Sequence, residues 1–128
     1  MPADIRKVTP VLVVDAIEPA LPFWVDRMGF EKTVELPEGD ALGFVILVKD
    51  GVEIMYQTRA SLRSDVPSLA DAPAATSLFV EVSDIEAVAR AVQGLEVVVP
   101  RRKTFYGMDE IGVREPGGHL IVFAQPAE

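Results

Sequence analysis

An acidic residue inside a strand-like segment is the first feature of this sequence that could do chemistry. Glu53 stands between Val52 and Ile54 in "GVEIMYQ", directly after an Asp-Gly pair that favours a tight hairpin turn. A carboxylate that points into a half-buried sheet normally has a partner, which is often a metal ion. Glu53 therefore binds a metal, contacts a ligand, or lies on the solvent face of its strand.

The sequence offers few other reactive side chains. It contains no cysteine, which excludes disulfides, thiolate catalysis and cysteine-ligated zinc. His119 is the single histidine and follows Gly117 and Gly118, so we interpret it as a turn residue rather than a ligand. General acid catalysis by Glu53 remains open, but no second catalytic group can be assigned to it.

Composition narrows the possible partners. The 128 residues are 49% hydrophobic and 25% charged, which is typical of one globular domain. The net charge of -8 disfavours nucleic acid and anionic membrane surfaces, because phosphate binding needs a basic face. The same charge is compatible with a cationic ligand or with solubility alone. Residues 1–10 lack a long apolar run and no segment is long enough to span a bilayer, so we expect a cytoplasmic protein.

Apolar periodicity predicts one helix and four strands in the first half. Apolar residues recur at helical spacing from Ile17 to Met28, and Asp15 is the expected N-terminal cap. Pro22 lacks a backbone donor, so the first turn should be irregular. The expected strands are 8–15, 30–36, 41–48 and 52–57.

The second half repeats this order. A capping box at 83–86 begins the expected helix, and Gly94 ends it. The expected strands are 76–82, 95–100, 103–107, 110–116 and 119–125. Residues 58–75 hold two prolines and lack strand alternation, which indicates a linker with one short helical turn.

Two similar segments, "VDAIEPA" at 14–20 and "VSDIEAV" at 82–88, indicate an internal duplication. We therefore predict a single α+β domain, 1–128. It contains two βαβββ modules whose mixed curved sheets form a cleft or incomplete barrel, with the helices on the outside. The expected boundaries are 5–58 for the first module, 59–75 for the linker and 76–126 for the second module.

Three segments in this order, 13–30, 77–88 and 106–125, resemble the glyoxalase/bleomycin resistance protein/extradiol dioxygenase (vicinal oxygen chelate) superfamily. The first closes on Gly-Phe, the second opens the repeat with "SLFVEVSDIEAV", and the third carries "EPGGH" before the last strand. In character the chain is closest to the metal-free, bleomycin-resistance-like members. The resemblance implies a homodimer, in which each cleft is formed either within one chain or by modules of two chains.

The resemblance also implies four metal-ligand positions in catalytic members. They fall on Thr9, Glu53, Ser77 and Val122, of which Glu53 alone matches. One carboxylate with two hydroxyls and a valine is not a usable transition-metal site. We therefore expect no metal and no cofactor.

Strand alternation from these positions predicts a mainly apolar cleft face with a few polar groups, as in small-molecule pockets. The candidate ligand-binding residues are Thr9, Val11, Phe44, Glu53, Met55, Gln57, Ser77, Phe79, Glu81, Phe105, Tyr106 and Val122. Glu53, with Glu81, would favour a flat cationic guest.

The sequence favours a non-catalytic protein that binds a small molecule, in the manner of bleomycin resistance proteins, with a cationic or aromatic antibiotic as one ligand class. A divergent metal-dependent lyase, isomerase or dioxygenase of the same superfamily is the second hypothesis. A structural dimer module with a collapsed cleft is the third.

Overall fold

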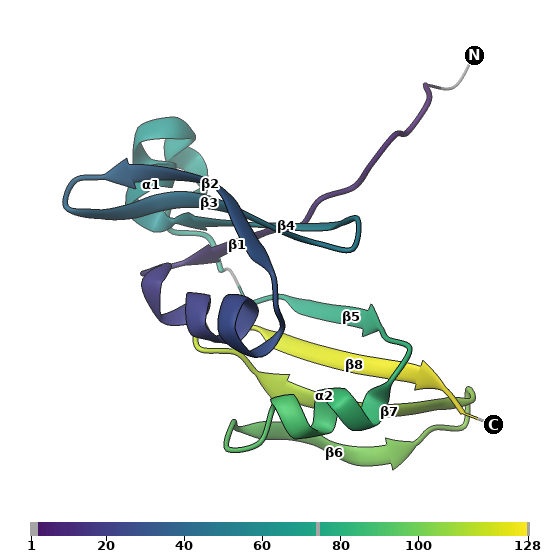
Figure 1. The fold of residues 1–128 in the computed structure, drawn as a ribbon. Helices are drawn as coiled ribbons and strands as arrows, with labels where there is room; N and C mark the ends of the chain where they lie inside the picture. Colours follow the sequence, from purple (N-terminus) through teal and green to yellow (C-terminus); the bar gives the residue numbers. More distant parts are fainter. Residues whose placement is uncertain (1–2, 74, 128) are drawn as a thin grey trace.

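The computed structural model describes residues 3–73 and 75–127, and it contains two four-stranded mixed sheets (Figure 1). The first sheet has the order β1-β4-β3-β2, and the second has the equivalent order β5-β8-β7-β6. The strands are β1 (Val11–Val14), β2 (Glu31–Glu38), β3 (Ala41–Lys49), β4 (Val52–Thr58), β5 (Ser77–Glu81), β6 (Val97–Lys103), β7 (Met108–Arg114) and β8 (Leu120–Pro126). In each sheet the first strand is parallel to the last and the remaining pairs are antiparallel, which confirms the predicted α+β class with two repeated modules.

The first helical segment is irregular, as Pro22 indicated. It consists of a 3₁₀ turn, η1 (Glu18–Ala20), followed by a π-helix, η2 (Pro22–Arg27). The prediction that Asp15 caps this segment is wrong, because Ile17 occupies the N-cap position without a side-chain hydrogen bond. The Asp15 carboxylate is instead paired with Arg59 at 3.4 Å.

The second helix, α2 (Ile85–Ala91), begins one residue later than the predicted capping box. Asp84 is its N-cap, and its Oδ1 accepts the Ala87 N–H at 3.2 Å. The strand predicted at 103–107 is also wrong. β6 continues to Lys103, and the following residues turn back to β7 through Gly107, whose positive φ of 84° suits a residue without a Cβ.

The segment expected as a linker contains two helical pieces, α1 (Arg59–Asp65) and η3 (Pro67–Leu69). Thr58 caps α1 by accepting the Ser61 N–H at 3.1 Å. Figure 1 shows α1 on the far side of the first sheet from η2. None of the helices in the described residues has the length and apolar character needed to cross a membrane.

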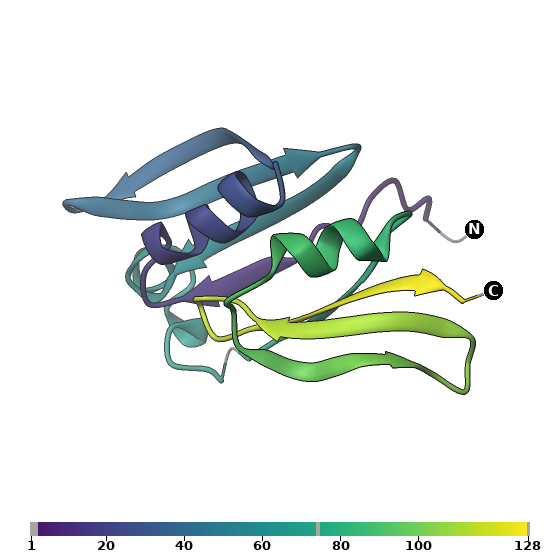
Figure 2. The same ribbon diagram turned by 60° about the horizontal axis from the view of Figure 1, so that its bottom comes forward.

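A single hydrophobic core joins the two modules. It takes alternate residues from the strands of both sheets together with the buried sides of η2 and α2, so that Phe23 of η2 lies 6.4 Å from Phe123 of β8, ring to ring. Figure 2 shows η2 over the first sheet and α2 over the second. In both sheets the face that packs against the helix therefore points into the shared core. The opposite face, which we call the cleft-side face, points outward.

A buried polar chain also joins the modules. The indole N–H of Trp24 donates to the Tyr56 hydroxyl at 2.8 Å, and that hydroxyl donates to Glu115 Oε2 at 2.8 Å. The other carboxylate oxygen accepts the backbone N–H of His119 at 2.6 Å. Burial, together with the charge of Glu115, raises the pKa of Tyr56, so this hydroxyl stays protonated and continues to donate.

Candidate functional site

An open pocket lies on the cleft side of the first sheet, and we call it the cleft-face pocket. Its volume is about 420 Å³, within the range of small-molecule sites. It is lined by Val11, Val13, Gln57, Leu62, Asp65, Val66, Leu69, Ala72, Pro73 and Thr76. The floor comes from β1 and β4, and the wall comes from α1, η3 and the residues after them. The lining is mainly apolar, with a polar corner where the Gln57 side chain donates to Ser61 Oγ at 3.0 Å.

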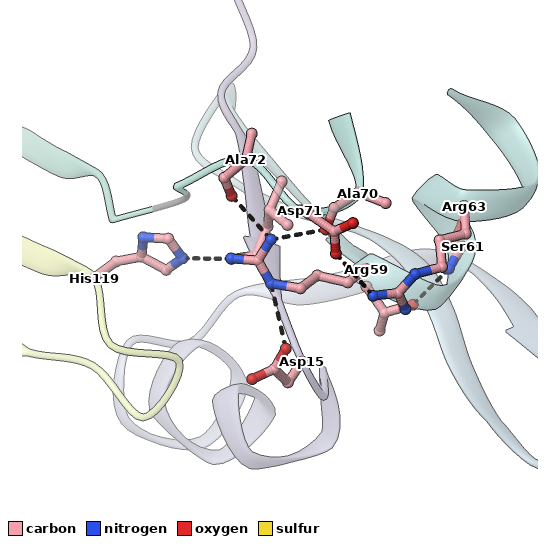
Figure 3. A network of polar contacts seen from close by, with 10 residues as sticks. Asp15, Arg59, Ser61, Arg63, Ala70, Asp71, Ala72 and His119 are labelled. Atoms are coloured by element: carbon pink, nitrogen blue, oxygen red, sulfur yellow. Dashed lines mark hydrogen bonds and ion pairs between the residues drawn. The ribbon is translucent and has the colours of Figure 1, made fainter. Parts of the chain in front are cut away.

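Arg59 fixes this wall to the rest of the molecule (Figure 3). Its guanidinium donates to the carbonyl oxygens of Ala70 at 2.8 Å and Ala72 at 2.9 Å, and it is paired with Asp15 at the end of β1. The Arg59 side chain therefore connects residues 70–72, at the end of the segment that covers the pocket, to the end of β1.

His119 lies beside this arrangement and is almost completely buried. Its Nδ1 accepts the backbone N–H of Thr76 at 3.0 Å, which assigns the ring hydrogen to Nε2, 3.0 Å from the Val13 carbonyl oxygen. Figure 3 shows the Arg59 guanidinium pointing toward the ring. The single histidine thus connects the β7–β8 turn to β1 and to the start of β5, and it does not line the cleft-face pocket.

A second pocket, which we call the arm pocket, lies between the N-terminal arm (residues 3–10), the start of β4 and β5. Its volume is about 390 Å³. It is lined by Lys7, Val8, Pro10, Gly51, Val52, Glu53, Ile54, Leu78, Phe79, Val80 and Glu81. It therefore brings together Glu53, Phe79 and Glu81, three of the residues that the sequence selected.

Glu53 has an internal cation as its partner. The Lys7 ammonium lies 3.0 Å from Glu53 Oε1, and the Thr9 hydroxyl donates to the same oxygen at 3.1 Å. The hydrogen bond from Lys7 is the main cause that holds the pKa of Glu53 below its ordinary value, against the opposing effect of desolvation; Thr9 adds a smaller contribution. Glu53 is therefore a charged carboxylate at neutral pH, so it is unsuited to donating a proton as a general acid.

The second sheet carries its own glutamate on the cleft side. Glu110 on β7 shares a face with Ala124 and Glu81 by strand register. Arg102 reaches its Oε1 at 2.8–2.9 Å, and the Tyr106 hydroxyl donates to Glu110 Oε2 at 2.9 Å. This carboxylate is buried, with 1% of its side chain exposed, and the sequence reasoning did not select it.

The remaining predicted residues are spread over both sheets. Val11 and Gln57 line the cleft-face pocket, and Thr9 contacts Glu53. On the first sheet, strand register places Met55 opposite Val11 and Phe44 opposite Gln57. On the second sheet, Ser77 is opposite Leu120 and Val122 is opposite Phe79. Phe105 and Tyr106 form an exposed edge-to-face pair in the β6–β7 turn, with ring centroids 5.1 Å apart. The twelve residues thus do not form one site within a single chain.

The four positions that correspond to metal ligands do not suit a metal. Thr9 and Glu53 are hydrogen-bonded to each other, whereas Ser77 and Val122 lie on the other sheet. Among residues 3–73 and 75–127 no group of three or more His, Cys, Asp or Glu side chains could hold an ion. The donor set on these faces therefore does not fit a transition metal.

Sequence reasoning missed Lys7 and the apolar residues Leu62, Val66 and Leu69 of the linker. A signal existed for the linker, because its apolar residues recur at helical spacing after Thr58, a good N-cap. No local signal pairs Lys7 with Glu53, because 46 positions separate them.

Comparison with solved structures places the fold among known ones. A glyoxalase/bleomycin resistance protein/dioxygenase from Nocardioides matches with a TM-score of 0.74 and 20% identity, over 99% of this chain and 87% of that one. TnmS3, an antibiotic-binding protein from Streptomyces sp. CB03234, matches at 0.72 and 19%, over 98% and 100%. The bleomycin-binding protein from Streptomyces verticillus, solved with copper(II)-bleomycin, matches at 0.64 and 21%, over 99% of both chains.

No protein-family model matches the sequence, and no curated protein matches it either. The likeness is therefore one of fold. The chain has the fold of the glyoxalase/bleomycin resistance/dioxygenase superfamily, which hosts both binding proteins and enzymes, so function must be argued from the sites.

Proposed function

We propose that this protein is a non-catalytic, homodimeric binder of small apolar or aromatic molecules, of the bleomycin resistance type. The observation that carries the proposal is the cleft-face pocket. It is an apolar cavity of about 420 Å³ with a polar corner at Gln57, on the face that the superfamily resemblance assigns to ligands. Two of the similar structures are described as antibiotic-binding and bleomycin-binding proteins, which makes such antibiotics the first ligands to test.

A second copy of the chain would complete the cleft. The cleft-side faces turn outward, and they leave large apolar side chains such as Val11 and Phe79 about half exposed. Exposed apolar area of this kind on two separate faces is characteristic of surfaces that associate. In a two-fold dimer, the first sheet of one copy would face the second sheet of the other, and each cleft would receive residues from both.

The chemistry of the faces favours binding over catalysis. Two of the carboxylates on the cleft-side faces are paired with a cation of the chain, Glu53 with Lys7 and Glu110 with Arg102. The described partners of these two carboxylates include no histidine, and the described lining of the cleft-face pocket and of the arm pocket holds no nucleophile–base pair of the kind that covalent catalysis requires.

The test is a calorimetric titration with a panel of antibiotics that includes copper(II)-bleomycin, combined with light scattering to measure the mass in solution. Val11→Asn places an amide in the pocket and should weaken binding about tenfold, because an apolar ligand group would face an unpaired polar one. Val97→Asn is the matched control, since Val97 is also on an edge strand and similarly exposed (47% against 45%). Equal effects of the two substitutions, or no binding of any compound, would contradict the binding function. A monomeric mass at all concentrations would contradict the dimer.

A further inference from the structure

His119 connects two residues of the cleft-face pocket through their backbone atoms. Its Nδ1 accepts the N–H of Thr76, and its Nε2 donates to the carbonyl oxygen of Val13, each at 3.0 Å. Val13 belongs to β1 of the first module, whereas Thr76 directly precedes β5 of the second, and both residues line the pocket. Only 2% of His119 is exposed. The geometry of this end of the pocket therefore depends on the imidazole ring.

These two hydrogen bonds require the neutral form of the ring. A neutral imidazole has one donor nitrogen and one acceptor nitrogen, whereas both nitrogens donate in the protonated ring. A hydrogen on Nδ1 would point at the N–H of Thr76, so that two donors would face each other. A buried charge and a buried donor without an acceptor are both unfavourable. The protonated ring is therefore accommodated only if His119 and Thr76 move apart.

The charged and titratable groups around the ring act in opposite directions. The Arg59 guanidinium, at the start of α1, points toward the ring of His119 and opposes a second positive charge (Figure 3). Glu115 favours a positive ring, but its two oxygens already accept the Tyr56 hydroxyl and the backbone N–H of His119. Asp15, after β1, is paired with Arg59 and is 92% exposed, so solvent screens its charge. Among the described residues, no carboxylate forms a hydrogen bond with the ring nitrogens.

Arg59 extends the effect of the ring to the wall of the pocket. Its guanidinium donates to the carbonyl oxygens of Ala70 and Ala72. A positively charged ring would repel the side chain that holds these residues in place.

We infer that His119 is an acid-sensitive latch of the cleft-face pocket. The neutral ring fixes Thr76 and Val13, whereas the protonated ring releases Thr76 and weakens the contact of Arg59 with residues 70–72. The open form binds one more proton than the closed form, so each unit by which the pH falls favours opening by up to about tenfold. The inference goes beyond the proposed binding function and does not depend on it, because it is tested in the ligand-free chain.

The experiment is an NMR titration of the ligand-free full chain from about pH 8 to about pH 5, the range in which histidine side chains change charge. The ring carbon resonances report the protonation of the single histidine in the sequence. The amide resonances of Thr76, Ala72 and Val14 should move with the same midpoint as the ring. The protection of the Thr76 amide against hydrogen exchange, corrected for the intrinsic rate, should fall at least about tenfold. Amides that stay fixed while the ring is protonated, or a ring that remains neutral throughout, would overturn the inference.

Two variants identify the titrating group. His119→Gln keeps an oxygen that can accept from Thr76 and an amide nitrogen that can donate to Val13, but it does not titrate. Its amides should show no transition, and the protection of the Thr76 amide should change less than about twofold over the same range. Asp15→Asn removes the carboxylate beside Arg59 and should keep the transition. A transition that persists in His119→Gln or is lost in Asp15→Asn would assign the latch to another group and overturn the inference. If His119→Gln does not fold, the agreement of the ring and amide midpoints in the native chain and in Asp15→Asn decides the outcome.

Discussion

The two modules differ in how they pair a glutamate on the cleft side of the sheet. Each module pairs one glutamate on the cleft side of its sheet with one cation and one hydroxyl. For Glu53 these are Lys7 and Thr9, and for Glu110 they are Arg102 and Tyr106. The first carboxylate keeps 20% of its side chain exposed, whereas the second keeps 1%.

The difference lies in where the partners come from. Arg102 and Tyr106 belong to the same β6–β7 hairpin as Glu110, so the sheet cannot form without bringing them together. Lys7 comes from an arm outside the sheets, so Glu53 can lose its partner without loss of fold. A local partner makes the carboxylate structural, and a remote one leaves it available to a ligand.

The contact that joins the modules should be the costliest to break. Tyr56→Phe removes the hydroxyl between Trp24 and Glu115, leaving a buried donor and a buried carboxylate oxygen short of a partner. The free energy of unfolding should fall by about 2–4 kcal/mol in urea denaturation. Tyr106→Phe is the matched control and should cost less than about 1 kcal/mol, because Glu110 keeps Arg102. Similar losses for the two tyrosines would show that the modules are not joined by this chain.

The second-largest effect should be the difference in stability between variants of Glu110 and of Glu53. Glu110→Ala removes a buried, hydrogen-bonded carboxylate and should lower the free energy of unfolding by about 2 kcal/mol. Glu53→Ala should leave the thermal midpoint unchanged, because its ion pair with Lys7 is exposed. Calorimetric scans of both variants measure the contrast. A large loss in Glu53→Ala would mean that the arm is part of the folded unit.

Acid should weaken the ion pairs of Arg101 in the second module. Arg101 donates to Asp109 at 2.6 and 2.9 Å and to Glu86 at 2.7 Å, and these bonds lower the pKa of both carboxyls below their ordinary values. A carboxyl whose pKa is lower in the folded than in the unfolded state stabilises the fold above the unfolded pKa, and this stability is lost as the pH falls through the folded pKa.

Arg101→Gln should therefore reduce the loss of stability between about pH 5 and pH 2, measured by urea denaturation at several pH values. Lys7→Gln should leave the loss of stability over this pH range nearly as it is in the native chain. If the two variants reduce the loss of stability at acid pH equally, the ion pairs of Arg101 have no special role in acid sensitivity.

The smallest effect concerns the pKa of Glu53 alone. In Lys7→Gln this pKa should rise toward its ordinary value, because the largest cause of its depression is removed. Thr9→Val should raise it less. Carbon-13 NMR titration of the carboxyl resonance measures both. An unchanged pKa in Lys7→Gln would mean that the arm does not hold Lys7 against Glu53 in solution.

Local patterns in the sequence predicted most of the elements and several residues of the sites. The apolar alternation of β3 and β4 and the repeated strand-helix order were sufficient for two modules, and the resemblance suggested how they are arranged. The wrong predictions concern positions where two neighbouring side chains could cap a helix or where a distant partner binds the expected cap, which sequence rules do not decide. Asp84 rather than Ser83 caps α2, and Asp15 is drawn away from the first helix by Arg59.

Glu53 was singled out correctly as an unusual residue, but its partner was not foreseeable. Lys7 and Thr9 precede β1, and they reach Glu53 because β1 pairs with β4 in parallel, with Val11 opposite Met55. Glu110 was missed for the converse reason, since an acid near two arginines and a tyrosine in a hairpin reads as an ordinary solvent-exposed strand end.

The sequence by itself determined the order of strands and helices, the duplication and the absence of cysteine, because these depend on periodicity and residue type along the chain. The tertiary structure alone decided that both helix-side faces share one core, that the two pockets are separate, and that Glu53 and Glu110 each pair with a cation. Those outcomes depend on contacts between residues tens of positions apart, whose free energies become available only when the strands pair and the modules pack.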